Sequence, residues 1–124
     1  MNHEYIKFLS LSEYGRHFLL RSYSLELLII LYEVDQVDGI EQLYSMLHSK
    51  KSKMPAFLAY LNYLEDRNCI LKFTNAEKKS QRVIALSEGC RADIAPIFDH
   101  PRWNTETKIA SYNQNGVHQQ LQRI

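Results

Sequence analysis

The chain has 124 residues, of which 45% are hydrophobic and 23% are charged. These values are typical of one globular domain, and with only two cysteines they argue against a disordered chain, a collagen-like fibre or a disulfide scaffold. Fifteen lysines and arginines nearly balance fourteen aspartates and glutamates. The net charge of +1 therefore indicates neither nucleic acid nor a membrane as the partner, and a charged surface must arise from local clustering.

The sequence contains no candidate membrane span and no recognisable export signal. The longest apolar run, residues 27–31, is far shorter than the roughly 20 residues that cross a bilayer. Residues 1–11 lack the basic stretch and apolar segment of a signal peptide. We therefore expect a cytoplasmic protein in which Cys69 and Cys90 are reduced. Cys69 stands at the start of an apolar strand, which favours a buried, unreactive thiol over a redox sensor.

Hydrophobic spacing predicts three helical segments in the first 48 residues. The first lies within residues 2–20, as one helix or two short ones. The second, residues 24–35, has Ser24 as its expected N-cap and is apolar nearly all round, so it should be buried on most sides. The third, residues 39–48, is amphipathic. Its apolar positions follow the spacing i, i+3, i+4, i+7: Ile40, Leu43, Tyr44 and Leu47.

A basic connector, residues 48–53, leads to a fourth predicted helix over residues 53–67. Ser52 is its expected N-cap, and Pro55 falls in the first turn, where a missing N–H costs least. Asn68 tolerates the left-handed conformation that often ends a helix. One face of this helix is apolar: Phe57, Leu58, Leu61 and Leu64.

The pattern then changes to that of a β-hairpin over residues 70–86, with a polar loop between its strands. A last helix is predicted over residues 88–98, where Pro96 weakens the final turn. Residues 99–124 form a C-terminal extension, helical or loosely ordered. The predicted fold is therefore mainly α with a small β-hairpin, in one domain over residues 1–98.

Residues 24–94 resemble a winged helix-turn-helix protein, and specifically the MarR-type transcriptional regulators. The apolar helix followed by a short amphipathic helix is the first feature. Residues 57–70, FLAYLNYLEDRNCI, are similar to the family's recognition helix and its exit, and residues 82–89, RVIALSEG, to its second wing strand and next helix start. The chain departs from the family in three places. Asn68 stands where the family prefers Gly, and the wing loop lacks the family's Asp-x-Arg pattern. The Leu-Ser-Glu-Gly element is one residue shorter than usual.

The resemblance implies a homodimer whose N- and C-terminal helices intertwine, with terminal helices flanking the winged unit. The apolar positions in residues 5–20 and 88–98 suit this role, although they equally suit packing on their own domain. The resemblance also implies a small aromatic effector for some members. In this chain only the tyrosines suggest such an effector, and ordinary packing in the core and at interfaces also explains their number.

The resemblance further implies sequence-specific binding to double-stranded DNA, with the recognition helix in the major groove and the wing on the flanking backbone. The N-terminal residues of a recognition helix lie nearest the bases, with Asn62 or Tyr63 at the margin. Lysines at the helix entry and in the wing suit phosphates, and an arginine suits the minor groove. The predicted DNA-binding residues are Lys50, Lys51, Ser52, Lys53, Ala56, Tyr60, Tyr63, Lys78, Lys79 and Arg82.

Two other interpretations stay open. The lysine clusters are also typical of a solvated surface, and the fold would equally serve as a protein-interaction module, which the near-neutral charge and eight tyrosines fit. Catalysis has little support, because no glycine-rich phosphate loop, nucleophile elbow or His-carboxylate metal pattern is present. No enzymatic activity, metal or other cofactor is predicted.

Overall fold

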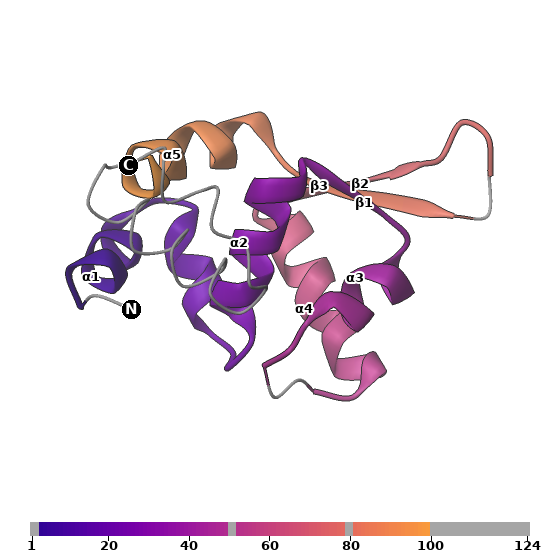
Figure 1. The fold of residues 1–124 in the computed structure, drawn as a ribbon, viewed down its shortest axis with the longest axis horizontal. Coiled ribbons are helices and arrows are strands. Elements are labelled where there is room, and N and C mark those ends of the chain that lie inside the picture. The colour runs from indigo at the N-terminus through magenta and orange to yellow at the C-terminus, as the bar shows by residue number, and fades with distance from the viewer. Residues whose placement is uncertain (1–2, 50–51, 79–80, 100–124) are drawn as a thin grey trace, which may run out of the picture.

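The computed structural model describes residues 3–49, 52–78 and 81–99. Within them the helices form one body, and a β-hairpin projects from it at the end opposite the N-terminal helix (Figure 1). The prediction of a mainly α fold with a small β component is confirmed, whereas the predicted extension over residues 99–124 lies, after Asp99, outside the described residues. The elements in chain order are α1 (His3–Leu11), the 3-10 helix η1 (Gly15–Leu19), α2 (Ser24–Val34), β1 (Gln36–Asp38), α3 (Ile40–Met46), α4 (Met54–Asp66), β2 (Ile70–Thr74), β3 (Arg82–Leu86) and α5 (Glu88–Phe98).

The hairpin belongs to a three-stranded antiparallel sheet with the order β1-β3-β2 among the described residues. Val37 of β1 pairs with Ile84 of β3, which pairs on its other side with Lys72 of β2. Strand β1 was not predicted, because a strand of three residues is too short to show an alternating pattern. The strand forms where Asp35 takes a φ of 65°, ends α2 and turns the chain beside β3.

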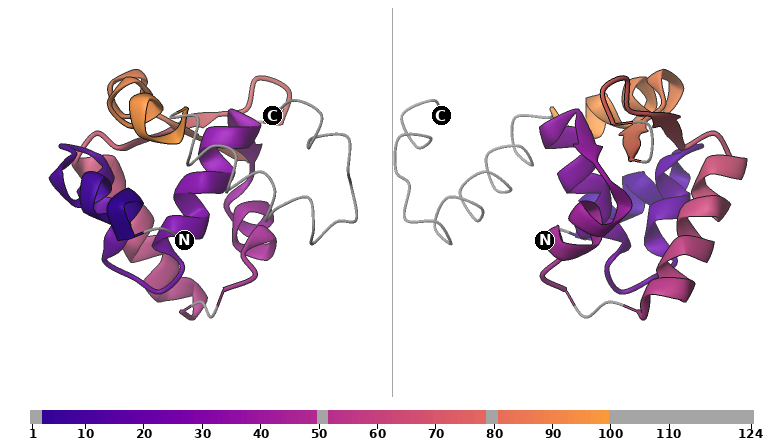
Figure 2. Two further views of the ribbon diagram at one scale, coloured as in Figure 1. Left: turned by 60° about the vertical axis from the view of Figure 1, so that its left-hand side comes forward. Right: turned by 90° about the vertical axis from the view of Figure 1, so that its right-hand side faces the viewer.

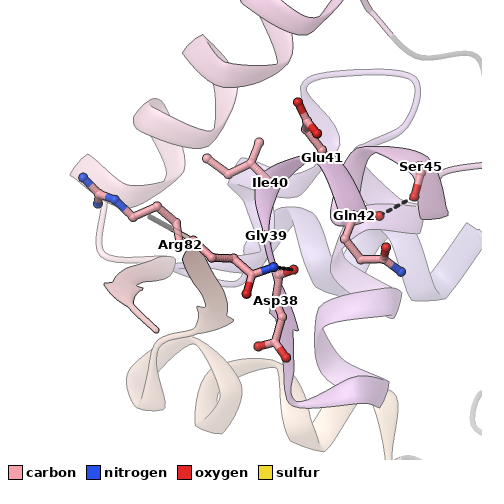
Figure 3. Close-up of a pocket in the computed structure, with 8 residues that line it drawn as sticks. Asp38, Gly39, Ile40, Glu41, Gln42, Ser45 and Arg82 are labelled. Atoms are coloured by element: carbon pink, nitrogen blue, oxygen red, sulfur yellow. Dashed lines mark hydrogen bonds between the residues drawn. The ribbon is translucent and has the colours of Figure 1, made fainter. Parts of the chain in front are cut away.

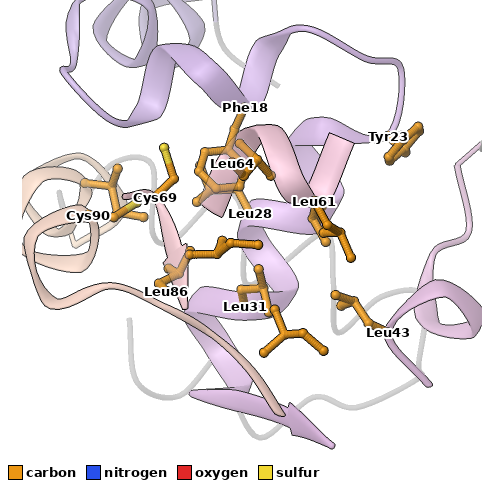
Figure 4. Packing of buried hydrophobic residues seen from close by; sticks show 14 of the residues in the cluster. Phe18, Tyr23, Leu28, Leu31, Leu43, Leu61, Leu64, Cys69, Leu86 and Cys90 are labelled. Carbon is orange, nitrogen blue, oxygen red and sulfur yellow. The ribbon is translucent and has the colours of Figure 1, made fainter. Parts of the chain in front are cut away.

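The hydrophobic core lies between α2, α4, α5 and the inner face of the sheet (Figure 4). Leu28 and Leu31 of α2 face Leu61 and Leu64 of α4, and all four side chains are fully buried. The prediction that α2 is buried on most sides is confirmed, since only Glu33 and Val34 at its end are exposed.

The first helical segment consists of two separate elements, α1 and η1. Gly15 packs so closely that a Cβ there would lie 2.8 Å from Leu9 Cδ2 and from Ser12 Oγ. Ser12 Oγ accepts the N–H of Gly15 at 2.9 Å and donates to the Asp93 carboxylate of α5. Asp93 also accepts the N–H of Tyr14 at 2.9 Å, so this turn fastens η1 to α5.

Two of the expected N-caps are wrong. Ser24 lies inside α2, where its hydroxyl accepts the N–H of Arg21, and the helix has no side-chain cap. The Ser52 hydroxyl lies 3.1 Å from that of Tyr23 and does not cap α4. Each serine hydroxyl instead bonds to a distant tyrosine, Ser24 to Tyr60 and Ser52 to Tyr23. The sequence does not reveal these tertiary hydrogen bonds.

The other helix signals agree better with the structure. Pro55 lies in the first turn of α4, and Asn68 has the expected left-handed backbone, with a φ of 61°. Ser87 caps α5, because its hydroxyl accepts the N–H of Cys90 at 3.0 Å. Pro96 does not shorten α5, which continues to Phe98.

Candidate nucleic-acid interface

The outer face of α4 is a solvent-exposed surface that no other described element covers (Figure 2, right view). The opposite side of the helix is buried, because Phe57, Leu61 and Leu64 point into the core. We define the outer face by its exposed residues: Pro55, Ala56, Leu58, Ala59, Asn62 and Asp66.

The entry to α4 carries the first predicted cations. Lys53 and Ala56 are exposed as expected, and Ser52 is half-buried. Lys50 and Lys51 lie outside the described residues. Lys53 forms no ion pair with any described residue, so its charge is available to a ligand.

Glu26 of α2 holds the loop that leads to these lysines, a role the sequence analysis missed. Its Oε1 accepts the N–H of His48 at 2.9 Å and that of Ser49 at 2.8 Å. Burial alone would raise the pKa of Glu26, but these N–H groups bind its charged form, and the net effect lowers the pKa. The ionised carboxylate therefore stabilises the approach to α4.

We expect Glu26→Gln to lower the free energy of unfolding by about 1–2 kcal/mol at pH 7, because a hydrogen bond to a charged group is stronger than one to an amide. Since the pKa of Glu26 is lower in the folded protein than in the unfolded chain, its stabilisation is present above the unfolded value of 4.5 and is lost as the pH falls through the folded value. Urea unfolding at pH 7 and pH 3 measures both effects. Glu41→Gln on α3 is the control, and a variant as stable as this control would contradict the role of Glu26.

The prediction that Tyr60 contacts DNA is wrong. Its side chain is only 2% exposed, and its hydroxyl accepts from Ser24 Oγ at 2.8 Å and donates to the carbonyl of His17 at 2.5 Å. Tyr60 follows Phe57 by three residues and precedes Leu64 by four, so it lies on the buried side of the helix. The helical spacing of Tyr60 from Phe57 and Leu64 could therefore have predicted its burial from the sequence.

We expect Tyr60→Phe to lower the free energy of unfolding by about 1–3 kcal/mol, because Ser24 Oγ and the His17 carbonyl would be left without their buried partner. Chemical denaturation measures the change. Tyr63→Phe, at a half-buried hydroxyl, is the control and should cost less. If both variants lost the same free energy of unfolding, the buried hydrogen bonds of the Tyr60 hydroxyl would not be the stronger connection between η1 and α4.

Tyr63 lies beside the outer face, where it supports η1. Its hydroxyl is 2.8 Å from His17 Nδ1, and the guanidinium of Arg67 lies 4.1 Å above its ring. The side chain is half-buried and already engaged on both sides. Tyr63 therefore borders the surface without projecting from it.

The hairpin supplies the second group of cations. Lys78 and Arg82 are exposed and form no ion pair with a described residue, whereas Lys79 lies outside the described residues. The loop is held by Asn75, whose Oδ1 accepts the N–H groups of Glu77 at 2.8 Å and Lys78 at 3.1 Å. These bonds fix the start of the loop up to Lys78, whereas Arg82 is held in strand β3.

A shallow hollow of about 530 Å³ lies between the start of α3 and the base of the hairpin (Figure 3). Gln81 closes one side, and its Nε2 donates to the carbonyl of Asp38 at 3.0 Å. Arg82 contributes a positive charge, while Asp38 and Glu41 contribute carboxylates. The two carboxylates offset the charge of Arg82, so the lining of this hollow has no net positive charge to attract an anion.

Lys72 has a structural role on β2 between the hairpin and α4. Its Nζ lies 3.2 Å from Glu65 Oε1 and donates to Asn62 Oδ1 at 2.5 Å, and its side chain is largely buried. These partners lie on a different element from Lys72, so the sequence alone does not reveal them. The two interactions fix the hairpin against α4, the candidate recognition helix.

The described residues give little support for a reactive thiol, a metal site or a membrane span. Cys69 and Cys90 are both buried free thiols, a burial that was predicted for Cys69 only, and burial raises the pKa of Cys69 to about 11 and that of Cys90 to about 12. In this part of the chain no three His, Cys, Asp or Glu side chains gather as metal ligands. None of the helices in the same residues has both the length and the apolar character needed to span a bilayer.

Comparison with known proteins yields no match. No protein-family model matches the chain, and searches of curated proteins and of solved structures find no similar protein either.

Proposed function

We propose that the protein binds double-stranded DNA as a winged helix-turn-helix regulator, with α4 in the major groove and the β2–β3 hairpin on the flanking backbone. The observation that carries this proposal is the order α2, β1, α3, α4, β2, β3 with the sheet order β1-β3-β2. This arrangement puts a pair of helices next to a projecting hairpin, as the resemblance to MarR-type regulators implies.

The surface chemistry supports the same function. The major groove of B-DNA is wide enough for an α-helix, and α4 has an uncovered outer face that begins at Lys53. Lys78 and Arg82 on the hairpin add charges that are unpaired in the described part of the chain. Cations at both ends of one surface suit phosphates on either side of a groove.

The experiment that tests this function is a fluorescence-anisotropy titration of the protein with a random duplex at two salt concentrations. Binding through phosphates releases counterions, so we expect the affinity to fall steeply as salt rises. A protein that binds no duplex at low salt would refute the proposal.

We further propose that the protein acts as a homodimer through its N-terminal helix. Ile6 and Leu11, two of the large apolar side chains of α1, are exposed, and an exposed apolar patch of this kind is typical of an interaction surface; Leu11 is 74% accessible. Light scattering tests this proposal, and a monomer at micromolar concentration would contradict it.

One observation favours a protein partner as the second candidate function. Leu71 and Phe73 project from the same face of β2 and are 47% and 43% exposed. An apolar strand face of this kind is typical of an interaction surface. Stable association with another protein, together with indifference to DNA at low salt, would favour this alternative.

A further inference from the structure

The outer face of α4 has an unusual composition for a helix that contacts DNA. From Pro55 to Ala59 its exposed side chains are small or apolar, and none is charged. The negative charge of Asp66 lies at the far end of the face, one turn beyond Asn62. The amide of Asn62 is therefore the polar side chain available for base contacts in the first three turns.

The orientation of the Asn62 amide is fixed by Lys72. An ammonium group only donates hydrogen bonds, so the amide atom that faces Lys72 Nζ must be the oxygen. Lys72 is itself held by Glu65, at 3.2 Å. The remaining amide nitrogen, Nδ2, makes no hydrogen bond within the described part of the chain. Asn62 thus offers an oriented donor on an otherwise apolar surface.

The two alanines match an A·T pair better than a G·C pair, whereas the Nδ2 donor of Asn62 suits acceptors of either pair, since guanine also presents N7 and O6. In the major groove thymine presents a C5-methyl group and an O4 acceptor, and adenine presents an N7 acceptor. Guanine is read mainly by arginine or lysine, and the outer face contains neither. Alanine side chains allow close approach and contact thymine methyl groups well.

We propose that the outer face of α4 reads thymine methyl groups through Ala56 and Ala59, with Asn62 donating to a base acceptor, so that the preferred site is an A·T-rich duplex. This inference rests on the proposed function, because it names the sequence class that the same surface recognises. A duplex suits this face better than an apolar protein segment does, since Lys53, Lys78 and Arg82 carry charges unpaired by any described residue.

The test compares duplexes of one length in anisotropy titrations with the wild-type protein. One is A·T-rich, the second has deoxyuridine in place of every thymidine, and the third is G·C-rich. Deoxyuridine keeps the phosphates and the base pairing but removes the methyl group. We expect binding to weaken about fourfold for each methyl group that the protein no longer touches, and to be weaker again for the G·C-rich duplex.

The possible results separate the two proposals. Equal, salt-dependent affinity for the thymidine and deoxyuridine duplexes would overturn methyl reading and leave DNA binding intact. Failure to bind any of the three duplexes at low salt would overturn the proposed function itself. Since both results come from the wild-type protein, they do not depend on the folding of a variant.

A variant tests the part assigned to Asn62. Asn62→Ala should weaken binding to the A·T-rich duplex about tenfold and leave the salt slope unchanged, because no phosphate interaction is removed. Gln36→Ala, at an exposed amide on β1, is the matched control and should bind as the wild type does. Thermal unfolding checks that both variants are folded. Unchanged affinity of folded Asn62→Ala would overturn the role of Asn62.

Discussion

Replacing Lys53, Lys78 and Arg82 together by alanine is expected to flatten the salt dependence of DNA binding. Each phosphate interaction that is removed should reduce the slope of log K against log salt by about 0.9, so the triple variant should lower it by about 2.7. The affinity at a fixed low salt concentration should fall by about tenfold or more, and by similar factors on all sequences, because phosphate interactions carry no sequence information.

The three side chains are suitable for this experiment because their removal should not disturb the fold. All three are exposed, and none forms an ion pair within the described residues. Substitutions at such positions usually change stability by less than about 0.5 kcal/mol. Anisotropy titrations at several salt concentrations measure the slope, and circular dichroism confirms the fold.

Lys7→Ala is the matched control for the single variant Lys53→Ala. Both remove one exposed cation, but Lys7 lies on α1, at the end of the molecule opposite the hairpin (Figure 1). Only Lys53→Ala should change the slope. If the triple variant keeps the wild-type slope, the surface formed by α4 and the hairpin is not where the phosphates bind.

Most of the helices could be predicted from the sequence because their apolar residues recur over two turns or more between clear stop signals. Helix α4, Met54–Asp66, matches the predicted range 53–67 to within a residue at each end. Pro55 at its start and Asn68 after its end act through local backbone geometry, which requires no knowledge of tertiary contacts. Local signals of this kind can be read from one sequence.

The features that were missed depend on contacts between distant segments. Ser24 and Ser52 have good capping side chains, but the structure uses their hydroxyls to bind Tyr60 and Tyr23. Strand β1 exists because β3 lies beside it, and three residues carry no pattern of their own. Tertiary pairing therefore overrides local preference at these positions.

The candidate site was predicted in outline but not in its details. Lys53, Ala56, Lys78 and Arg82 are all exposed, with Ala56 on the outer face of α4 and Arg82 at the start of β3. The orientation of Asn62 depends on Lys72, ten residues away on another element, so spacing along α4 alone does not reveal it. A contact between a helix and a strand needs three-dimensional structure to be seen.

The largest loss of stability is expected from Phe57→Ala. Phe57 is fully buried, with its ring centroid 5.1 Å from that of Tyr44 and 5.8 Å from that of Tyr23. Truncating a buried phenylalanine costs about 3–5 kcal/mol, because the apolar packing of the ring is removed and a cavity remains. That is a large part of the roughly 5–15 kcal/mol by which a domain of this size is stable.

Leu58→Ala is the control for Phe57→Ala, because the two residues are adjacent and face opposite sides of α4. Leu58 belongs to the outer face and is 37% exposed, so its truncation should cost less than about 1 kcal/mol. Urea unfolding followed by circular dichroism compares the two variants, and Phe57→Leu provides a milder change if Phe57→Ala does not fold. A similar loss of stability in both would contradict the division of α4 into a buried side and an outer face. If Leu58→Ala stays folded, it also tests that face, because a change in its DNA affinity cannot then be attributed to unfolding.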